Sequence, residues 1–342
     1  MGLSALRKGF KASCRPLIGL DGCFLKTYLG GILLCAIGKD GNNGMFPISW
    51  AIVEIENEDC WTWFLKCLLE DLQIVDGNGW TFISDQQKGL QNAVANLAPR
   101  AEHRNCARHV YMSWKKQHKC ITLKNMFWRA VKCTYIEDFK MAIQAMKVEN
   151  AAACEDFIAR DVNKFCKAFL STFACSDMVD NNINETFNGY ILNARGKHVI
   201  HMCEEIRTSL MVRQVQKFKQ MSSVTERLCP NIRLILERLK IESVSCIAHP
   251  ALGNKFEVHD EANKFVVNIE RRTCSCRVWD LVGIPCKHAI SALTFLQQDA
   301  SDYVNDYYSM SKYLAGYEFG IEPIRGNKMW PEVDGVVVKQ FS

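Results

Sequence analysis

The chain has 342 residues, of which 48% are hydrophobic, 10% aromatic and 23% charged, and its formal net charge is +5. This composition is ordinary for a globular protein and excludes disordered, collagen-like and low-complexity chains. The longest uncharged apolar run, residues 30–38, is far shorter than the roughly 20 residues that a membrane-spanning helix needs. We therefore expect a soluble chain with no membrane partner. The first residues lack a secretory signal, so we also expect an intracellular location.

The 17 cysteines are scattered, odd in number and without a regular framework, so most are expected to be buried small side chains. Positive charge is concentrated in residues 195–240, which contain ten Lys or Arg against four Glu, a net charge of +6. Charge runs usually form a solvated helix face. This segment is therefore compatible with a nucleic-acid partner without requiring one.

Three strands and a helix open the chain. Apolar runs separated by Asp-Gly and Asn-Gly turn signals predict an antiparallel meander at residues 17–25, 30–39 and 46–53. Apolar side chains at helical spacing predict a helix over residues 59–73. A buried strand over residues 80–84 and a helix over residues 88–97 follow.

This order of elements is the opening order of the RNase H-like α/β fold, in which a mixed sheet carries carboxylates at strand ends. Many α/β domains begin in a similar way, so periodicity alone does not choose among them. Residues 107–174 have a helical pattern rich in Trp, Phe and Lys, which predicts a helical insertion.

Two carboxylates lie at strand positions where an ionised group is costly. Asp21 is within the apolar run at residues 17–25, and burial there requires a positive partner such as a metal ion. Asp85 follows residues 80–84, at the carboxyl end of a strand, where α/β sites are often built. Each residue alone is more simply explained as a turn or helix cap.

A third carboxylate lies beyond the expected insertion. If Asp180 or Asn181 caps a helix, the apolar stripe of that helix leaves Glu185 on the other side, with Asn188 and Gly189. Glu185 could then face a polar cleft. By itself it is more simply explained as a solvated helix residue.

Together these segments resemble the transposase domain of Mutator-like elements, the MULE family, from which the plant far-red-impaired-response regulators also derive. The resemblance rests on Leu-Asp-Gly, Ser-Asp, His-Arg-Asn-Cys-Ala-Arg-His and Asn-Ile-Asn-Glu-Thr-Phe-Asn, with a tryptophan-rich segment between the first two. These pieces lie at residues 20–26, 50–54, 61–64, 84–89, 103–109 and 182–188. In spaced order they cover residues 10–195.

The resemblance implies an RNase H-like sheet with a DDE-type active site, whose matching positions here are Asp21, Asp85 and Glu185. Such a site holds two divalent ions that activate an attacking oxygen and stabilise the leaving oxygen at phosphorus. Mg²⁺ or Mn²⁺ suits these hard oxygen ligands. Glu185 is matched only on a short asparagine-rich motif.

Cys106 and His109 match a further pair in this family, shortly after the second carboxylate. Two ligands do not make a zinc site. A role at a helix start, or a hydrogen bond that orients DNA or a carboxylate, is at least as good an explanation as metal binding.

A second set of residues near the other end indicates zinc. Cys274 and Cys276 are followed by Cys286 and His288, and three thiolates with one imidazole are a standard tetrahedral zinc set. The stretch 255–297 resembles the SWIM zinc finger, with a strand at residues 265–269 and a closing helix at residues 289–296. Trp279 and Leu281 are expected to pack over the site. Four protein ligands make the zinc structural, and the resemblance associates the module with DNA or protein partners.

The resemblance also sets expectations for the ends of the chain. Family members usually carry a zinc-binding DNA-recognition domain ahead of the first carboxylate strand, whereas Asp21 is only twenty residues from Met1. We expect that module to be absent, which puts recognition of transposon ends in doubt. After a basic helical region at residues 196–250 and the finger, residues 298–342 form a tail with a short apolar segment at residues 336–338.

Two functions follow from these observations. The first is a DDE transposase that cuts and joins DNA, and the second is a non-catalytic nuclear DNA-binding or regulatory protein descended from one. A gene fragment without function is a third alternative. If DNA binds electrostatically, the residues expected to carry it are Arg207, Arg213, Lys217 and Lys219, and the alternative surface is Arg271, Arg272, Arg277 and Lys287.

Overall fold

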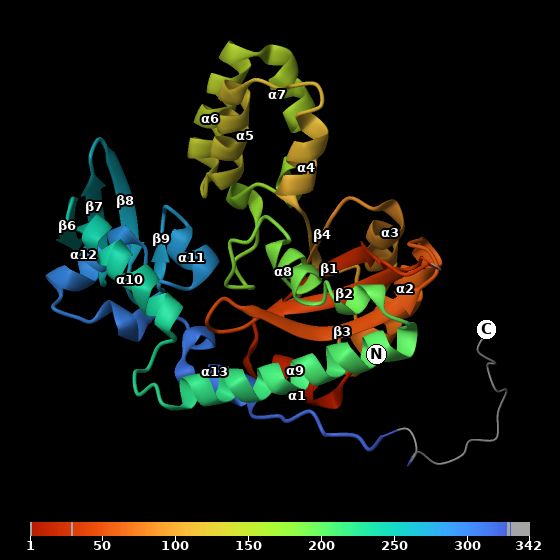
Figure 1. Ribbon diagram of the computed structural model, residues 1–342. Coiled ribbons are helices and arrows are strands. Elements are labelled where there is room, and N and C mark those ends of the chain that lie inside the picture. The colour runs from red at the N-terminus through yellow and green to blue at the C-terminus, as the bar shows by residue number, and fades with distance from the viewer. Residues whose placement is uncertain (1, 29, 327–328, 330–342) are drawn as a thin grey trace.

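The computed structural model describes residues 2–28, 30–326 and 329, and the expected apolar segment at residues 336–338 lies outside them. It consists of a sheet covered by helices, a helical lobe that stands out from it, and a second, smaller sheet (Figure 1). Within the described residues, no helix is both long and apolar enough to span a bilayer.

The first sheet is mixed, as the sequence predicts. In the described part of the chain its order is β3-β2-β1-β4-β5. The meander β1–β3 is antiparallel, and β4 and β5 continue the sheet in parallel with β1. Its strands are β1 Leu17–Phe24, β2 Ile32–Lys39, β3 Met45–Val53, β4 Thr81–Ser84 and β5 Glu102–Asn105. The polar sequence of β5 carries no strand signal and was not anticipated.

Side chains that alternate along β1 build two cores on opposite faces of this sheet. Ile18 and Leu20 join the cluster formed with helices α1 Ser4–Ser13, α2 Glu58–Leu72 and α3 Lys88–Leu97. Leu17 and Cys23 join the cluster formed with α8 Asn182–Tyr190 and α9 Val199–Ser222. Asp21 has the same parity as Leu17 and Cys23, so it belongs to the face that α8 covers.

The helical lobe has a core of its own. Phe127 lies at its centre, with ring centroids 5.2 Å from Trp114 and 5.1 Å from Phe157. The helices are α4 Ala107–Trp114, α5 Ile121–Lys132, α6 Ile136–Glu149 and α7 Ala151–Ile158, and the 3-10 turns Val162–Lys164 and Lys167–Phe169 lead back toward the sheet. This lobe corresponds to the expected helical insertion.

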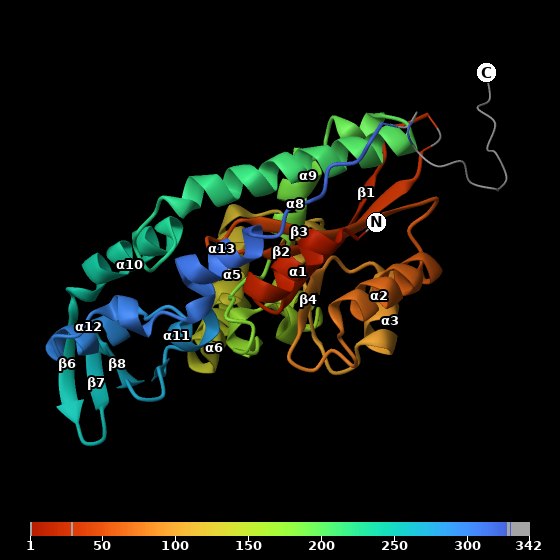
Figure 2. The same cartoon turned by 90° about the horizontal axis from the view of Figure 1, so that it is seen from below.

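The second sheet is antiparallel in the order β6-β7-β8-β9. Its strands are β6 Cys246–Ala251, β7 Lys255–Asp260, β8 Asn263–Asn268 and β9 Thr273–Cys274. The helices around it are α10 Pro230–Ser243, α11 Val278–Val282, α12 Lys287–Phe295 and α13 Met310–Tyr317. The expected helical region at residues 196–250 therefore ends too late, because β6 already pairs with β7. Long helix α9 leads from the first sheet toward this unit (Figure 2).

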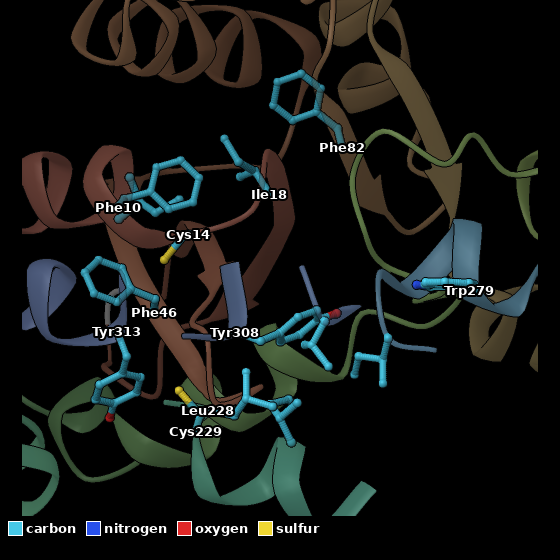
Figure 3. Packing of buried hydrophobic residues seen from close by; sticks show 14 of the residues in the cluster. Phe10, Cys14, Ile18, Phe46, Phe82, Leu228, Cys229, Trp279, Tyr308 and Tyr313 are labelled. Atoms are coloured by element: carbon cyan, nitrogen blue, oxygen red, sulfur yellow. The ribbon is translucent and has the colours of Figure 1, made fainter. Parts of the chain in front are cut away.

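The two sheets share one buried cluster, part of which Figure 3 shows. Phe10 and Phe46 from the first sheet's side lie in the same cluster as Tyr308 and Trp279. Arg15 links the same parts, because its Nη1 donates to Tyr308 Oη at 2.9 Å. The zinc-finger region is therefore packed onto the rest of the chain.

Candidate functional sites: a zinc centre and a group of carboxylates

The four predicted zinc ligands converge at one point of the second sheet. Cys274 ends β9, Cys276 lies in the following turn, and Cys286 and His288 open α12. All four are buried, and their ligand atoms lie within 4.8 Å of one another. Three thiols and an imidazole at this separation fit a structural zinc ion, with no position left for a substrate.

Local hydrogen bonds hold the cysteine-bearing backbone in place. Cys286 caps α12, because its Sγ accepts the amide N–H of Ala289 at 3.4 Å. Asp280 Oδ2 accepts the amide N–H of Cys274 at 3.0 Å. Hydrogen bonds with Cys274 and Cys286 lower the pKa of Cys276 well below its ordinary value, so a thiolate is already favoured there.

The imidazole of His288 is oriented from both sides. Its Nδ1 lies 3.7 Å from Cys274 Sγ, whereas its Nε2 lies 3.1 Å from Asp260 Oδ2. Nδ1 is therefore the atom that would bind zinc, and Asp260, by accepting a hydrogen bond from Nε2, fixes the tautomer and the orientation of the ring. Phe265 stacks on the ring with centroids 4.0 Å apart.

Asp260 was missed at the sequence level, because nothing in its position at the end of β7 marks it as a partner of His288. Lys287 Nζ lies 2.6 Å from its Oδ2. Partial burial raises the pKa of Asp260, but hydrogen bonds with Lys287 and His288 outweigh burial and lower it. Asp260 is therefore ionised when it faces the histidine.

At the first sheet, Asp21 lies within β1, and Asp85 directly follows the neighbouring strand β4. The parallel pairs run from Leu17 with Thr81 to Gly19 with Ile83, and continuing this register places Asp21 beside Asp85. Burial, followed by the charge of Asp85, raises the pKa of Asp21 to about 6, against a hydrogen bond from Asn188. Asn188 Nδ2 donates to Asp21 Oδ2 at 2.8 Å. These two carboxylates repel each other unless a cation lies between them.

Glu56 is a further carboxylate beside Asp85, and no sequence motif indicated it. It precedes α2, and its Oε1 accepts from Trp61 Nε1 at 3.1 Å. Burial and the charge of Asp85 raise the pKa of Glu56. A Cβ on Gly22 would lie 2.8 Å from the Glu56 carboxylate, so glycine at this position of β1 lets the carboxylate lie against the strand.

Helix α8 is held on β1 by its asparagines. Asn181 Nδ2 donates to the carbonyl of Leu20 at 2.9 Å. A Cβ on Gly19 would lie 2.2 Å from Asn184 Oδ1, so this close approach also requires glycine. The asparagine-rich motif therefore packs α8 against β1, next to Asp21.

Glu185 lies on α8, away from the buried Ile183 and Phe187, as expected. Its carboxylate forms an ion pair with Arg108, and the two side chains are 39% and 44% exposed. In the described part of the chain, the groups of three or more ligand atoms within 4.8 Å of one another contain neither Asp21, Asp85 nor Glu185. The structure thus places Asp21 and Asp85 together and pairs Glu185 with an arginine.

Two family models match the chain. Residues 17–113 match the MULE transposase domain, and residues 265–297 match the SWIM zinc finger. The chain carries a MULE transposase domain and a SWIM zinc finger. The MULE match includes Asp21, Glu56 and Asp85 but ends before Glu185, and the SWIM match includes all four zinc-ligand positions. No curated protein matches the chain.

Cys106 and His109 of the MULE domain lie beside the carboxylates. Cys106 is buried and its Sγ accepts the amide N–H of Asn181 at 3.3 Å. A hydrogen bond with Cys106, against burial and aided by the charges of Asp85 and Asp21, raises the pKa of His109 to about 9. His109 is therefore cationic near neutral pH. Among the described residues, the groups of potential metal ligands include neither Cys106 nor His109.

The predicted DNA-binding residues do not form one surface. Arg207 is only 6% exposed, its Nε donates to Glu204 Oε2 at 2.9 Å, and its Nη1 donates to the carbonyl of Glu322 at 3.2 Å. Arg213 Nη2 donates to the carbonyl of Met45 at 2.7 Å. The segment after α13 runs along α9 and covers this side of it (Figure 2). The expectation of an exposed Arg207 is therefore wrong, and Lys217 and Lys219 remain.

Two of the four residues of the alternative surface on the SWIM finger, Arg277 and Lys287, already make contacts within the protein. Arg277 Nη2 donates to the carbonyl of Leu170 at 2.7 Å, and its Nη1 donates to the carbonyl of Thr134 at 2.9 Å. Thr134 Oγ1 in turn donates to the carbonyl of Cys276 at 2.6 Å. With Lys287 paired to Asp260, Arg271 and Arg272 remain exposed. Arg277 thus fastens the SWIM finger to the helical lobe.

Trp279 and Leu281 are both buried, but they contribute to different cores. Trp279 joins the cluster that includes the zinc ligands, whereas Leu281 joins the cluster of the helical lobe. The short helix α11 is therefore a second point at which the SWIM finger and the lobe meet.

Proposed function

We propose that this protein is a DNA-binding protein derived from a MULE-type transposase, and that its MULE domain cleaves and transfers DNA strands with divalent metal ions. The observation that carries the proposal is the pair formed by Asp21, within β1, and Asp85, directly after the parallel strand β4, with Glu56 close by. Burial and mutual repulsion raise the pKa of Asp21 to about 6. Negative charge concentrated in this way fits a cation.

The sheet order supports an RNase H-like arrangement. Three antiparallel strands followed by two parallel ones, β3-β2-β1-β4-β5, bring the first and fourth strands side by side. We propose that Asp21 and Asp85 hold Mg²⁺ or Mn²⁺, with Glu185 approaching from α8 after it leaves Arg108. The ions supply activation of the attacking oxygen and stabilisation of the leaving oxygen. Asn188 and His109 orient the carboxylates.

A second candidate is a non-catalytic nuclear DNA-binding or regulatory protein that keeps the fold and the SWIM finger. The ion pair between Arg108 and Glu185 favours it, because a glutamate neutralised by arginine is not free to bind a metal. In either case we propose DNA as the partner, a structural Zn²⁺ in the SWIM finger, and a nuclear location.

The deciding experiment is a cleavage assay on the purified full chain with plasmid DNA and Mg²⁺ or Mn²⁺. We expect cleavage that falls by more than about 100-fold in Asp85→Asn, which exceeds the cost of losing a group that only hydrogen-bonds to a metal ligand. The matched control is Asp59→Asn, an exposed residue of α2, which should cleave like the wild type. DNA binding without cleavage in any metal supports the regulatory protein, and neither binding nor cleavage would refute both candidates.

A further inference from the structure

Three exposed lysines follow the end of α4, in the turn and loop after it and in the first turn of α5. Lys116, Lys119 and Lys124 are exposed, and within the described residues their ammonium groups have no ion pair. Arg129, Arg160 and Lys164 of the lobe differ, because each of them is paired with an aspartate. Unpaired lysines at one end of a lobe are available to an external anion.

Helix α4 leads from the carboxylate site to the first of these lysines. Ala107, Val110 and Trp114 of α4 are buried, so Arg108 and Met112, four residues apart, lie on its exposed face, and Lys116 follows in the turn after the helix. We call Arg108, Met112, Lys116, Lys119 and Lys124 the α4 face. Six residues at about 1.5 Å each carry α4 about 9 Å from Arg108 to its end at Trp114, two residues before Lys116.

The near end of the α4 face touches the carboxylate site. Arg108 pairs with Glu185, and the charges of Asp85 and Asp21 act on the neighbouring His109. Helix α4 is the element that connects the sheet to the lobe (Figure 1). The α4 face therefore begins at the carboxylates and leads away from them.

Nearby acids do not cancel the charge of this face. Asp156 is already paired with His118 and Arg160. Glu149, at the end of α6, acts on the thiol of Cys120 in the loop after α4. It has no ion pair with Lys116, Lys119 or Lys124 among the described residues. Lys115, whose Nζ lies 5.7 Å from the centre of the Tyr111 ring, adds to the positive charge of this turn.

We propose that the α4 face binds the phosphate backbone of the DNA strand that extends from the carboxylate site. This inference rests on the proposed function and names the surface that serves it. A phosphodiester held at Asp21 and Asp85 has neighbours along its strand, and exposed lysines neutralise such phosphates without reading sequence. The lobe is then a DNA-positioning arm, and α9 is a structural helix.

Two variants with the same change of charge test this surface. Lys116→Gln/Lys119→Gln removes two cations from the α4 face, and Lys217→Gln/Lys219→Gln removes two from α9. Affinity for a duplex of arbitrary sequence is measured against salt concentration, with the full zinc-loaded chain and Ca²⁺ in place of Mg²⁺ to prevent cleavage. Each lost phosphate contact should flatten the plot of log affinity against log salt by about 0.9, so the α4 variant should lose about 1.8. The α9 variant should keep the wild-type slope.

The outcomes separate this inference from the proposed function. If the wild type binds DNA and the α4 variant keeps the wild-type slope of log affinity against log salt, the α4 face does not bind DNA, although the protein does. An equal loss in both variants also overturns it, because binding would then be diffuse. If the wild type binds no DNA, the proposed function fails and the α4 face with it. Zinc content and the circular dichroism spectrum of each variant show that it is folded, and Lys116→Glu provides a second, stronger change at the same surface.

Discussion

Asp21 illustrates how a single residue can be held in an unfavourable setting for function. Its carboxylate is largely buried beside Asp85 and Glu56, and the hydrogen bond from Asn188 does not compensate for this, so its pKa rises from 3.8 to about 6. Above that pH the folded state carries an ionised group that the unfolded state holds in water. The free energy of unfolding therefore decreases as the pH rises from about 4 to about 6.

Asp21→Asn should accordingly stabilise the metal-free protein near pH 7.5 by about 2 to 3 kcal/mol, since one pKa unit corresponds to about 1.4 kcal/mol. Asparagine can still accept the hydrogen bond from Asn188. Urea unfolding in a chelator of divalent ions that spares the zinc measures the effect. Added Mn²⁺ should stabilise the wild type and leave the variant unchanged. A variant less stable than the wild type would show that the carboxylate is already satisfied.

His103 on β5 titrates in the opposite direction. Burial, with a smaller contribution from the charge of Lys164, lowers the pKa of His103 from 6.5 to about 4, and its Nε2 lies 2.8 Å from Ser84 Oγ. Below pH 6.5 the unfolded chain binds a proton that the folded chain excludes. Stability due to this residue is therefore complete above about pH 6.5 and is lost as the pH falls toward 4.

His103→Gln should flatten this part of the pH profile. Between about pH 7 and about pH 5 the wild type should lose about 2 kcal/mol more unfolding free energy than the variant, because glutamine does not titrate. Denaturant unfolding of both proteins at the two pH values gives the difference, in which effects common to both cancel. His201→Gln on the exposed side of α9 is the control and should follow the wild type. Parallel profiles for wild type and His103→Gln would contradict the assignment.

Among the elements, the joint between the SWIM finger and the lobe depends on Arg277. Its guanidinium donates to main-chain carbonyls of Thr134, Ala168 and Leu170, which end a helix and a 3-10 turn of the lobe. Carbonyls at such ends lack partners within their own element. One arginine therefore satisfies groups from two segments of the lobe and fixes α11 against them.

Arg277→Ala should destabilise the zinc-loaded chain by about 2 to 4 kcal/mol, because it leaves several partly buried carbonyls without a charged donor. The control is Arg271→Ala, an exposed neighbour, which should stay within about 0.5 kcal/mol of the wild type. Thermal unfolding monitored by circular dichroism compares the two. Equal stability of both variants would mean that water replaces the guanidinium and that the joint is loose.

In the whole molecule, the zinc site is not isolated from the first sheet. One cluster of buried side chains includes Cys274 and Cys286 together with Phe10, Ile18 and Tyr308. Arg15, 2% exposed, donates to Tyr308 Oη and to Asn43 Oδ1, and so ties the start of β1 to the chain after the finger. Loss of zinc is therefore expected to weaken packing beyond the four ligands.

We expect one zinc ion per chain by elemental analysis and faster amide hydrogen exchange in β8, β9 and α12 after chelation, with β1 to β4 less affected. Removal of the ion leaves thiolates that repel one another, and a small sheet has little apolar surface of its own. Asp260→Asn should weaken zinc binding by about 10- to 100-fold, because Asp260 orients His288. Asp302→Asn, at an exposed side chain, should bind zinc like the wild type. Unchanged exchange after chelation would refute a structural role for the metal.

The sequence alone was sufficient where the signal is local. The strands of the meander, helices α2 and α3, the position of Asp21 within β1 and the spacing of the four zinc ligands all follow from periodicity, turn residues and ligand spacing within short segments. The glycines at positions 19 and 22 can also be read from the sequence. The reason for them cannot, because Asn184 and Glu56, which pack against them, are brought there only by the fold.

Only the tertiary structure decided which charges are available. Arg207 and Arg277 look like exposed cations in the sequence, yet carbonyls more than 100 residues away accept their hydrogen bonds. Glu56 and Asp260 look like ordinary surface acids, yet they lie beside Asp85 and His288. The free energy of a charged side chain depends on burial and on its partners, and both are set by contacts between distant segments that no local pattern records.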